Sequence, residues 1–142
     1  MLETEYECLV CGFQLWNPVA SLPNTLVGLY DDARFPGRCL VSYRTHLDDL
    51  TEFTPEQMAQ FMTESMRVSR AIKTVTGCAR VNFAVLGNAV QHVHAHLIPR
   101  YPDTEDLPHR APWSDPRKQI ALPDNDKQRL IHQIQQQIEP RP

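Results

Sequence analysis

Short apolar segments alternate along this chain with one long segment of helical periodicity. Residues 25–30 (TLVGLY) and 38–43 (RCLVSY) are apolar, short and rich in β-compatible side chains. The segment between them, DDARFPG, is rich in the turn-forming residues Asp, Pro and Gly. The pattern therefore predicts two antiparallel strands, joined as a hairpin or as part of a meander.

A long helix is expected after these strands. Thr54 is a suitable N-cap, Pro55 suits the first helical position, and Gln57 completes a capping box. Apolar residues then recur at roughly helical spacing, and they are Met58, Phe61, Met62, Met66, Ile72 and Val75. Gly77 can end the helix, whose apolar face we interpret as part of the core.

Strand character returns at residues 79–88 and again at 92–99, where the second strand ends at a proline. Residues 101–123 contain many prolines and little periodicity, which predicts an excursion over the surface. Residues 126–138 predict a terminal helix, because apolar residues recur there every four positions. The order of strands, long helix and strands favours an α+β fold with a mainly antiparallel sheet.

Length and charge limit the classes of function. The 142 residues suit one domain, and with 42% hydrophobic residues the chain can bury an ordinary core. The net charge of -3 and the lack of a basic run argue against nucleic acid or a membrane surface as the main partner. No apolar stretch is long enough to span a bilayer, and the acidic amino terminus does not resemble a signal peptide. We therefore expect a cytoplasmic protein with reduced cysteines.

The four cysteines fall into two groups. Cys39 and Cys78 stand singly in apolar segments and are expected in the core. Cys8 and Cys11 form a C-x-x-C pair, which in a reducing compartment indicates metal binding or redox chemistry. No thioredoxin-like βαβ pattern follows the pair, so metal binding is the favoured interpretation.

The stretch QHVHAHLIPRY gathers three of the six histidines at every second position: His92, His94 and His96. On a strand they would share one face, while Val93, Ala95 and Leu97 fill the opposite, core-facing side. Two chemistries suit such a row, namely a metal site and a nucleophilic imidazole that attacks phosphorus. Solvated histidines on an exposed face, or three ligands of one catalytic metal, are the alternatives.

The sequence HVHAHLI resembles the histidine triad signature, His-φ-His-φ-His-φ-φ with φ apolar. Residues 29–50 are similar to the strand–turn–strand segment of that family, which ends in a basic residue and a histidine before the long helix. The resemblance covers roughly residues 8–101. It implies a HIT-like fold and a homodimer that hydrolyses or transfers nucleotides at the α-phosphate.

The resemblance also implies roles for individual residues. His94 would attack phosphorus and form a nucleotidyl–histidine intermediate, and His96 would bind phosphate or assist the leaving group. Related transferases carry Gln in place of His96, so the histidine favours hydrolysis of a nucleoside phosphoramidate or a dinucleoside polyphosphate. A purine nucleoside phosphate is the expected ligand.

Three further positions depart from the family pattern or fit it loosely. Asn88 stands where the family usually has Gln, and its amide can still donate to a phosphate oxygen. Ala89 stands where the family has Ser or Thr and supplies no hydroxyl. For the ribose-binding acid, Asp31 and Asp32 lie in the right neighbourhood and Asp32 is preferred, although a turn aspartate is an equal alternative.

Some family members build a structural zinc site, which here implies the ligands Cys8, Cys11, His46 and His92. Residues 1–20 would then be a zinc-binding tail, 79–101 the catalytic strands, and 102–142 a tail and helix within a single domain, 1–142. The rival hypothesis is a nucleotide-binding or partner-binding module with little turnover, for which the missing hydroxyl at Ala89 is the best support.

Overall fold

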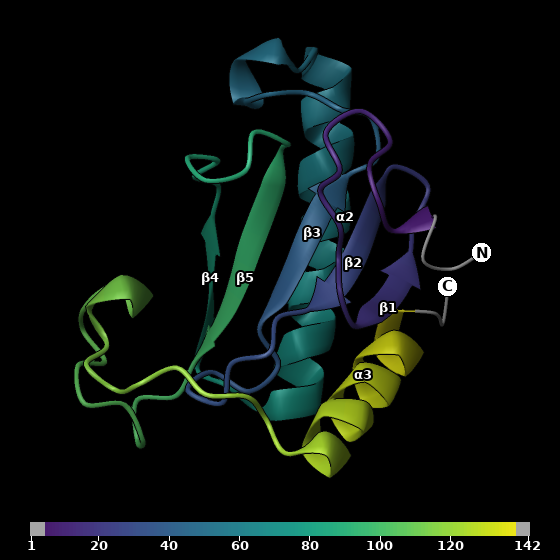
Figure 1. Ribbon diagram of the computed structural model, residues 1–142. Helices are drawn as coiled ribbons and strands as arrows, with labels where there is room; N and C mark the ends of the chain where they lie inside the picture. The colour runs from purple at the N-terminus through teal and green to yellow at the C-terminus, as the bar shows by residue number, and fades with distance from the viewer. Residues whose placement is uncertain (1–4, 139–142) are drawn as a thin grey trace.

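The computed structural model describes residues 5–138, which form one five-stranded sheet with two long helices (Figure 1). The strands are β1 (Pro18–Ser21), β2 (Thr25–Leu29), β3 (Cys39–Tyr43), β4 (Arg80–Ala84) and β5 (His94–Arg100). The helices are α2 (Pro55–Thr76) and α3 (Asp124–Ile138), with short 3-10 turns at Leu50–Glu52 and Pro112–Ser114. The strand order is β1-β2-β3-β5-β4, and every neighbouring pair is antiparallel. The α+β prediction is confirmed.

Helix α2 covers one face of the sheet and leaves the other face to the amino-terminal segment (Figure 1). Its start follows from the capping box, because Thr54 accepts from the Gln57 amide and the Gln57 side chain accepts from the Thr54 amide. Its end follows from Gly77, whose φ of 67° is left-handed and costs little without a Cβ. The predicted helix is confirmed at both ends.

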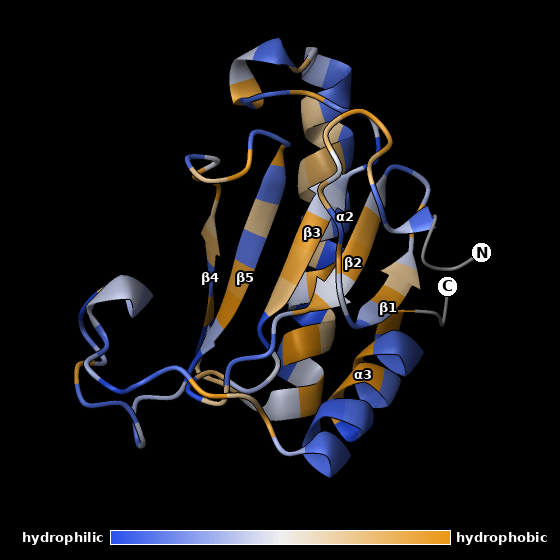
Figure 2. Ribbon diagram, in the orientation of Figure 1, coloured by the Kyte–Doolittle hydropathy of each residue, from blue (hydrophilic) through white to orange (hydrophobic). Residues whose placement is uncertain are grey.

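The core lies between α2 and the sheet. Val93, Ala95 and Leu97 are all buried there, as the alternation around the histidines predicts. Phe61 and Ile72 of α2 belong to the same buried cluster. Figure 2 shows hydrophobic colour along the central strands and on α2. The opposite face of β5 is therefore free to carry His94 and His96.

Helix α3 packs against α2 and β1, and its buried residues are Leu130, Ile134 and Ile138 (Figures 1 and 2). Asp31 fixes the approach to this helix, because its carboxylate accepts from the Leu122 amide at 2.7 Å and from Lys127 at 2.9 Å. The helix begins two residues before the predicted start. Among the described residues, no helix is both long and apolar enough to cross a membrane.

Two strand predictions were wrong in part. The strand expected at 79–88 ends at Ala84, and a loop follows in which Gly87 has a left-handed φ of 72°. The strand expected from His92 begins at His94, because the Val93 amide donates to Leu47 rather than continuing the ladder with β3. His92 therefore lies before the strand. Strand β1 lies within the predicted tail at 1–20 and just beyond it, and the sequence pattern did not indicate it.

Candidate functional site

Four metal-binding side chains converge where the amino-terminal segment meets the start of β5. They are Cys8, Cys11, His46 and His92, and their ligand atoms all lie within 4.8 Å of one another. The two histidine Nδ1 atoms are 3.3 Å apart. Cys8 Sγ lies 3.8 Å from His46 Nδ1, and Cys11 Sγ lies 3.5 Å from His92 Nδ1. The set joins three segments that are far apart in sequence.

Those separations match a tetrahedral zinc site. A zinc ion about 2.3 Å from sulfur and about 2.1 Å from nitrogen separates two nitrogen ligands by about 3.4 Å, and nitrogen from sulfur by about 3.6 Å. The observed distances of 3.3, 3.5 and 3.8 Å lie close to these values. The chemistry also fits, because two thiolates and two imidazoles form one of the common structural zinc sets.

Neighbours orient both imidazoles for such a role. His92 Nε2–H donates to the Tyr43 carbonyl at 2.7 Å, and His46 Nε2–H donates to the Asp48 carboxylate at 3.0 Å. Each bond places the proton on Nε2 and leaves the Nδ1 lone pair directed toward the cluster. Burial lowers the pKa of His92, which favours the neutral, ligating form.

His94 begins β5 and lies beside this cluster. Its Nδ1–H donates to the backbone carbonyl of His92 at 2.7 Å, so the Nε2 atom carries the free lone pair. The ring of Phe13 packs against His94 at 5.0 Å and against His92 at 5.5 Å between centroids. His94 is thus held in one orientation and one tautomer, as a nucleophilic imidazole requires.

His96 follows on the same face of β5, with its ring centroid 5.3 Å from that of His94. The Arg38 guanidinium donates to His96 Nδ1 at 3.0 Å. Burial, the Arg38 charge and then His94 lower the pKa of His96 to about 4. His96 is therefore neutral at pH 7 and presents an Nε2–H donor.

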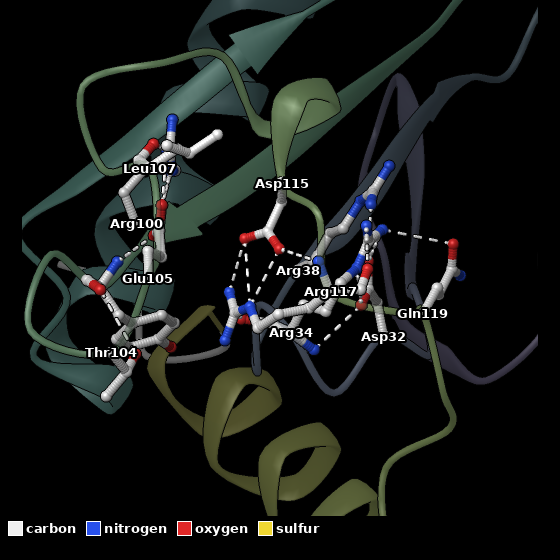
Figure 3. Close-up of polar contacts among 11 residues, drawn as sticks. Asp32, Arg34, Arg38, Arg100, Thr104, Glu105, Leu107, Asp115, Arg117 and Gln119 are labelled. Atoms are coloured by element: carbon white, nitrogen blue, oxygen red, sulfur yellow. Dashed lines mark hydrogen bonds and ion pairs between the residues drawn. The ribbon is translucent and has the colours of Figure 1, made fainter.

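Asp32 lies behind Arg38 and is fully buried. Its carboxylate accepts from Arg38 at 2.9 Å and from the Arg34 side chain at 2.9 and 3.0 Å (Figure 3). It also accepts from the Arg34 amide at 3.0 Å. Burial alone would raise the pKa of Asp32, but the two guanidinium groups hold this pKa below its usual value. The structure thus engages Asp32 with arginines and does not place it against the triad histidines.

Asn88 lies on the other side of the histidines, in the loop before β5. It is exposed and lines a hollow of about 750 Å³ together with Cys11, Phe13, Trp16, His46 and Gln91. Ala89 lines the same hollow and offers only its backbone. The predicted site residues therefore lie on two sides of His94. The cysteines, His46, His92 and Asn88 lie on one side. His96 lies on the other side, in contact with Arg38.

Comparison with known proteins decides the family. The HIT domain family matches residues 17–103 of this chain. The chain belongs to the histidine triad family. A histidine triad protein of known structure from Bradyrhizobium japonicum is 32% identical, covers 85% of this chain and 89% of its own, and superposes with a TM-score of 0.77. The HIT-like fold is confirmed.

Two other histidine triad proteins add detail. A zinc-bound family member from Mycobacterium smegmatis is 26% identical over 84% of each chain, with a TM-score of 0.60. The protein named hit from Bacillus subtilis is 33% identical over 70 residues, which are 46% of this chain and 48% of that relative. That match therefore spans about half the length of the Bacillus protein.

In this histidine triad protein, sequence reasoning missed three residues of the site. Arg38 contacts His96 across 58 positions of the chain, and no spacing indicates such a contact. Phe13 and Tyr30 pack on the triad rings, but isolated aromatic residues in apolar segments give no functional signal. Cys39 and Cys78 are buried, as predicted. The two histidines outside the triad and the metal-ligand set, His109 and His132, are exposed.

Proposed function

We propose that this protein is a histidine triad hydrolase that cleaves a nucleoside phosphoramidate or a dinucleoside polyphosphate at the α-phosphate. The observation that carries the proposal is the hydrogen bond from His94 Nδ1–H to the His92 carbonyl at 2.7 Å. It places the ring proton on Nδ1 and leaves the Nε2 lone pair of this largely buried ring available to attack phosphorus.

The proposed reaction has two steps. His94 Nε2 forms a bond to phosphorus while the bond to the leaving group breaks, which gives a nucleotidyl–histidine. Water then attacks phosphorus and returns the electron pair to Nε2. His96 Nε2–H is placed to donate to a phosphate oxygen throughout, and the Asn88 amide is our candidate for a second donor.

We also propose that Cys8, Cys11, His46 and His92 hold a structural zinc ion. When bound, the ion would tie the amino-terminal segment to the start of β5. His92 then has a structural role, and its carbonyl orients His94. This division of roles among the three triad histidines argues against a single catalytic metal shared by all of them, because both ring nitrogens of His92 already face other partners, Cys11 Sγ and the Tyr43 carbonyl.

The remaining candidate, Asp32, supports the site through Arg38 in our proposal rather than by contact with ribose. Both carboxylate oxygens already accept from guanidinium groups, Oδ1 from Arg34 and Oδ2 from Arg34 and Arg38. If Asp32 turned toward a ribose, the guanidinium groups of Arg34 and Arg38 would lose their buried carboxylate partner. Leaving buried charges unpaired costs free energy. The rival function, a nucleotide-binding module with little turnover, is favoured by Ala89, which provides no side-chain donor in the hollow beside Asn88.

One comparison separates the two functions. We expect the wild-type protein to release a nucleoside monophosphate from a diadenosine polyphosphate or a fluorogenic adenosine phosphoramidate. We expect His94→Ala to lose at least about 1,000-fold in kcat while nucleotide binding persists, because the nucleophile alone is removed. His132→Ala, on the exposed side of α3, is the matched control. Binding of nucleotide by the wild type without turnover of either substrate would favour the module instead.

A further inference from the structure

We propose that Arg38 is a positioning residue that holds His96 as a neutral Nε2–H donor, so that this site takes a phosphoric anhydride rather than a phosphoramidate. The inference rests on the proposed function, because it concerns which leaving group departs when His94 attacks. It makes Arg38 a determinant of substrate class although Arg38 itself need not touch the substrate.

The position of Arg38 is fixed from three sides. Its side chain is 8% exposed, and one NH group donates to the fully buried Asp32 carboxylate at 2.9 Å. The guanidinium carbon lies 3.8 Å from the ring centroid of Tyr30, within the range of a cation–π contact. The second NH2 group donates to His96 Nδ1 at 3.0 Å. The Asp32–Arg38–His96 chain therefore sets the orientation of the His96 ring.

This contact decides the charge and the tautomer of His96. Guanidinium nitrogen atoms only donate, so His96 Nδ1 must accept and the ring proton must lie on Nε2. Protonating Nδ1 would break the hydrogen bond and place two cations at contact distance. Beside Arg38, the rings packed against His96 are those of His94, Tyr30 and Trp113, and none carries a negative charge that would favour an imidazolium.

The other imidazoles of the site provide no replacement acid. His46 and His92 donate their Nε2 protons to Asp48 and to the Tyr43 carbonyl, and their Nδ1 atoms face the cysteines. His94 is the nucleophile, and Ala89 has no hydroxyl. Among the described residues whose rings pack against His96, Tyr30 is the one that carries an acidic hydroxyl group.

A site without a general acid discriminates between leaving groups. Cleavage of an anhydride breaks the bond from phosphorus to the bridging oxygen, and the electron pair departs with a phosphate that is stable as an anion. Cleavage of a phosphoramidate must expel an amine, and the departing nitrogen requires a proton because an amide anion is far too basic. In both cases water later supplies the hydroxyl of the nucleotide product and releases its proton to solvent.

The surroundings of His96 favour the same class by charge. A small hollow of about 250 Å³ opens next to it, lined by Arg34, Arg38, Tyr30 and Trp113 among others. Arg34 and Arg38 share the single Asp32 carboxylate, so this group keeps one net positive charge, which attracts the anionic oxygens of a polyphosphate and repels an ammonium group. Trp113 is half exposed and its ring lies 6.3 Å from that of His96, so it can cover a ligand there.

The test compares the wild-type protein on two substrates that share adenosine, a diadenosine polyphosphate and an adenosine phosphoramidate of an aromatic amine. We expect kcat/KM to be higher for the anhydride by about 100-fold or more, since general acid catalysis is worth at least that factor for an amine. Equal or faster cleavage of the phosphoramidate overturns the inference and leaves the proposed function intact. If Tyr30→Phe then abolishes that cleavage, Tyr30 is the acid.

If neither substrate is cleaved, the proposed function fails. The role of Arg38 is still tested by nitrogen NMR of the wild-type histidines, which reports the tautomer of His96 without any substrate. We expect His96 to be protonated on Nε2 alone at pH 7, and an imidazolium or an Nδ1–H tautomer would refute the role of Arg38. In Arg38→Met we expect both tautomers and a fall of about tenfold or more in the preference for the anhydride. Arg129→Met, an exposed arginine of α3, should keep the wild-type signals and the wild-type preference.

Discussion

His94 and His96 lie two residues apart on one strand, yet their neighbours fix opposite tautomers. A backbone carbonyl holds the proton of His94 on Nδ1, whereas a guanidinium forces the proton of His96 onto Nε2. On the same face of β5, one ring therefore offers a lone pair at Nε2 and the other a hydrogen-bond donor at Nε2. The sequence predicts that His94 and His96 carry the chemistry, but it does not predict their tautomers, which depend on contacts that no local pattern contains.

The neutral state of His96 predicts a pH dependence of stability. Its pKa of about 4 in the folded protein lies below the value of 6.5 for an unperturbed histidine. The unfolded chain then binds more protons than the folded one between these values, so the free energy of unfolding falls as the pH is lowered through that window. We expect His96→Gln to flatten this part of the profile, as measured by urea unfolding at a series of pH values.

The matched control is His132→Gln, because His132 is exposed on α3. In this control, the free energy of unfolding should change with pH between 6.5 and 4 as steeply as in the wild type. A wild-type slope in His96→Gln would mean that His96 is not held neutral in the folded protein.

Of all the elements, the amino-terminal segment depends most on the proposed zinc site to hold it against the rest of the protein. Its Cys8 and Cys11 side chains meet His46 from the loop after β3 and His92 from the turn before β5. Few buried apolar residues belong to this segment, since Tyr6 and Leu15 form only a small separate cluster with Leu26, against which Phe13 and Leu40 pack. A metal would supply the stability that apolar burial does not.

We therefore expect one zinc ion per chain by elemental analysis of the purified protein, and almost none in Cys8→Ser. The same substitution should lower the melting temperature, because structural zinc contributes directly to folding. Cys78→Ser removes a buried thiol outside the cluster and should keep the full zinc content. Equal zinc content in wild type and Cys8→Ser would exclude this ligand set.

The elements that the sequence predicted are those with strong local signals. Helix α2 carries a capping box and a terminal glycine, and β2 and β3 flank a turn-rich segment, so each boundary has a cause within a few residues. The β5 start was misplaced because distant groups decide it. The Val93 amide finds its acceptor at Leu47, and the Tyr43 carbonyl accepts from the His92 ring.

In the whole molecule, the sheet and α2 form a rigid support for a one-sided site. Alternation along β5 buries Val93, Ala95 and Leu97 against the core, and His94 and His96 project on the other face. The amino-terminal segment and the chain around Trp113 border this face from opposite sides. The convergence of Cys8, Cys11, His46 and His92 could be predicted because these four residues stand where the resemblance implies zinc ligands, whereas the Asp32–Arg38 contact could not.

The central claim is that His94 Nε2 becomes covalently bound to the nucleotide during turnover. The most direct measurement mixes enzyme with substrate for milliseconds, quenches in alkali and maps the modified peptide by mass spectrometry. We predict a nucleotidyl group on His94, absent in His94→Ala and present in His132→Ala. Product formation with no adduct, or an adduct on His92 or His96 instead, would contradict the account.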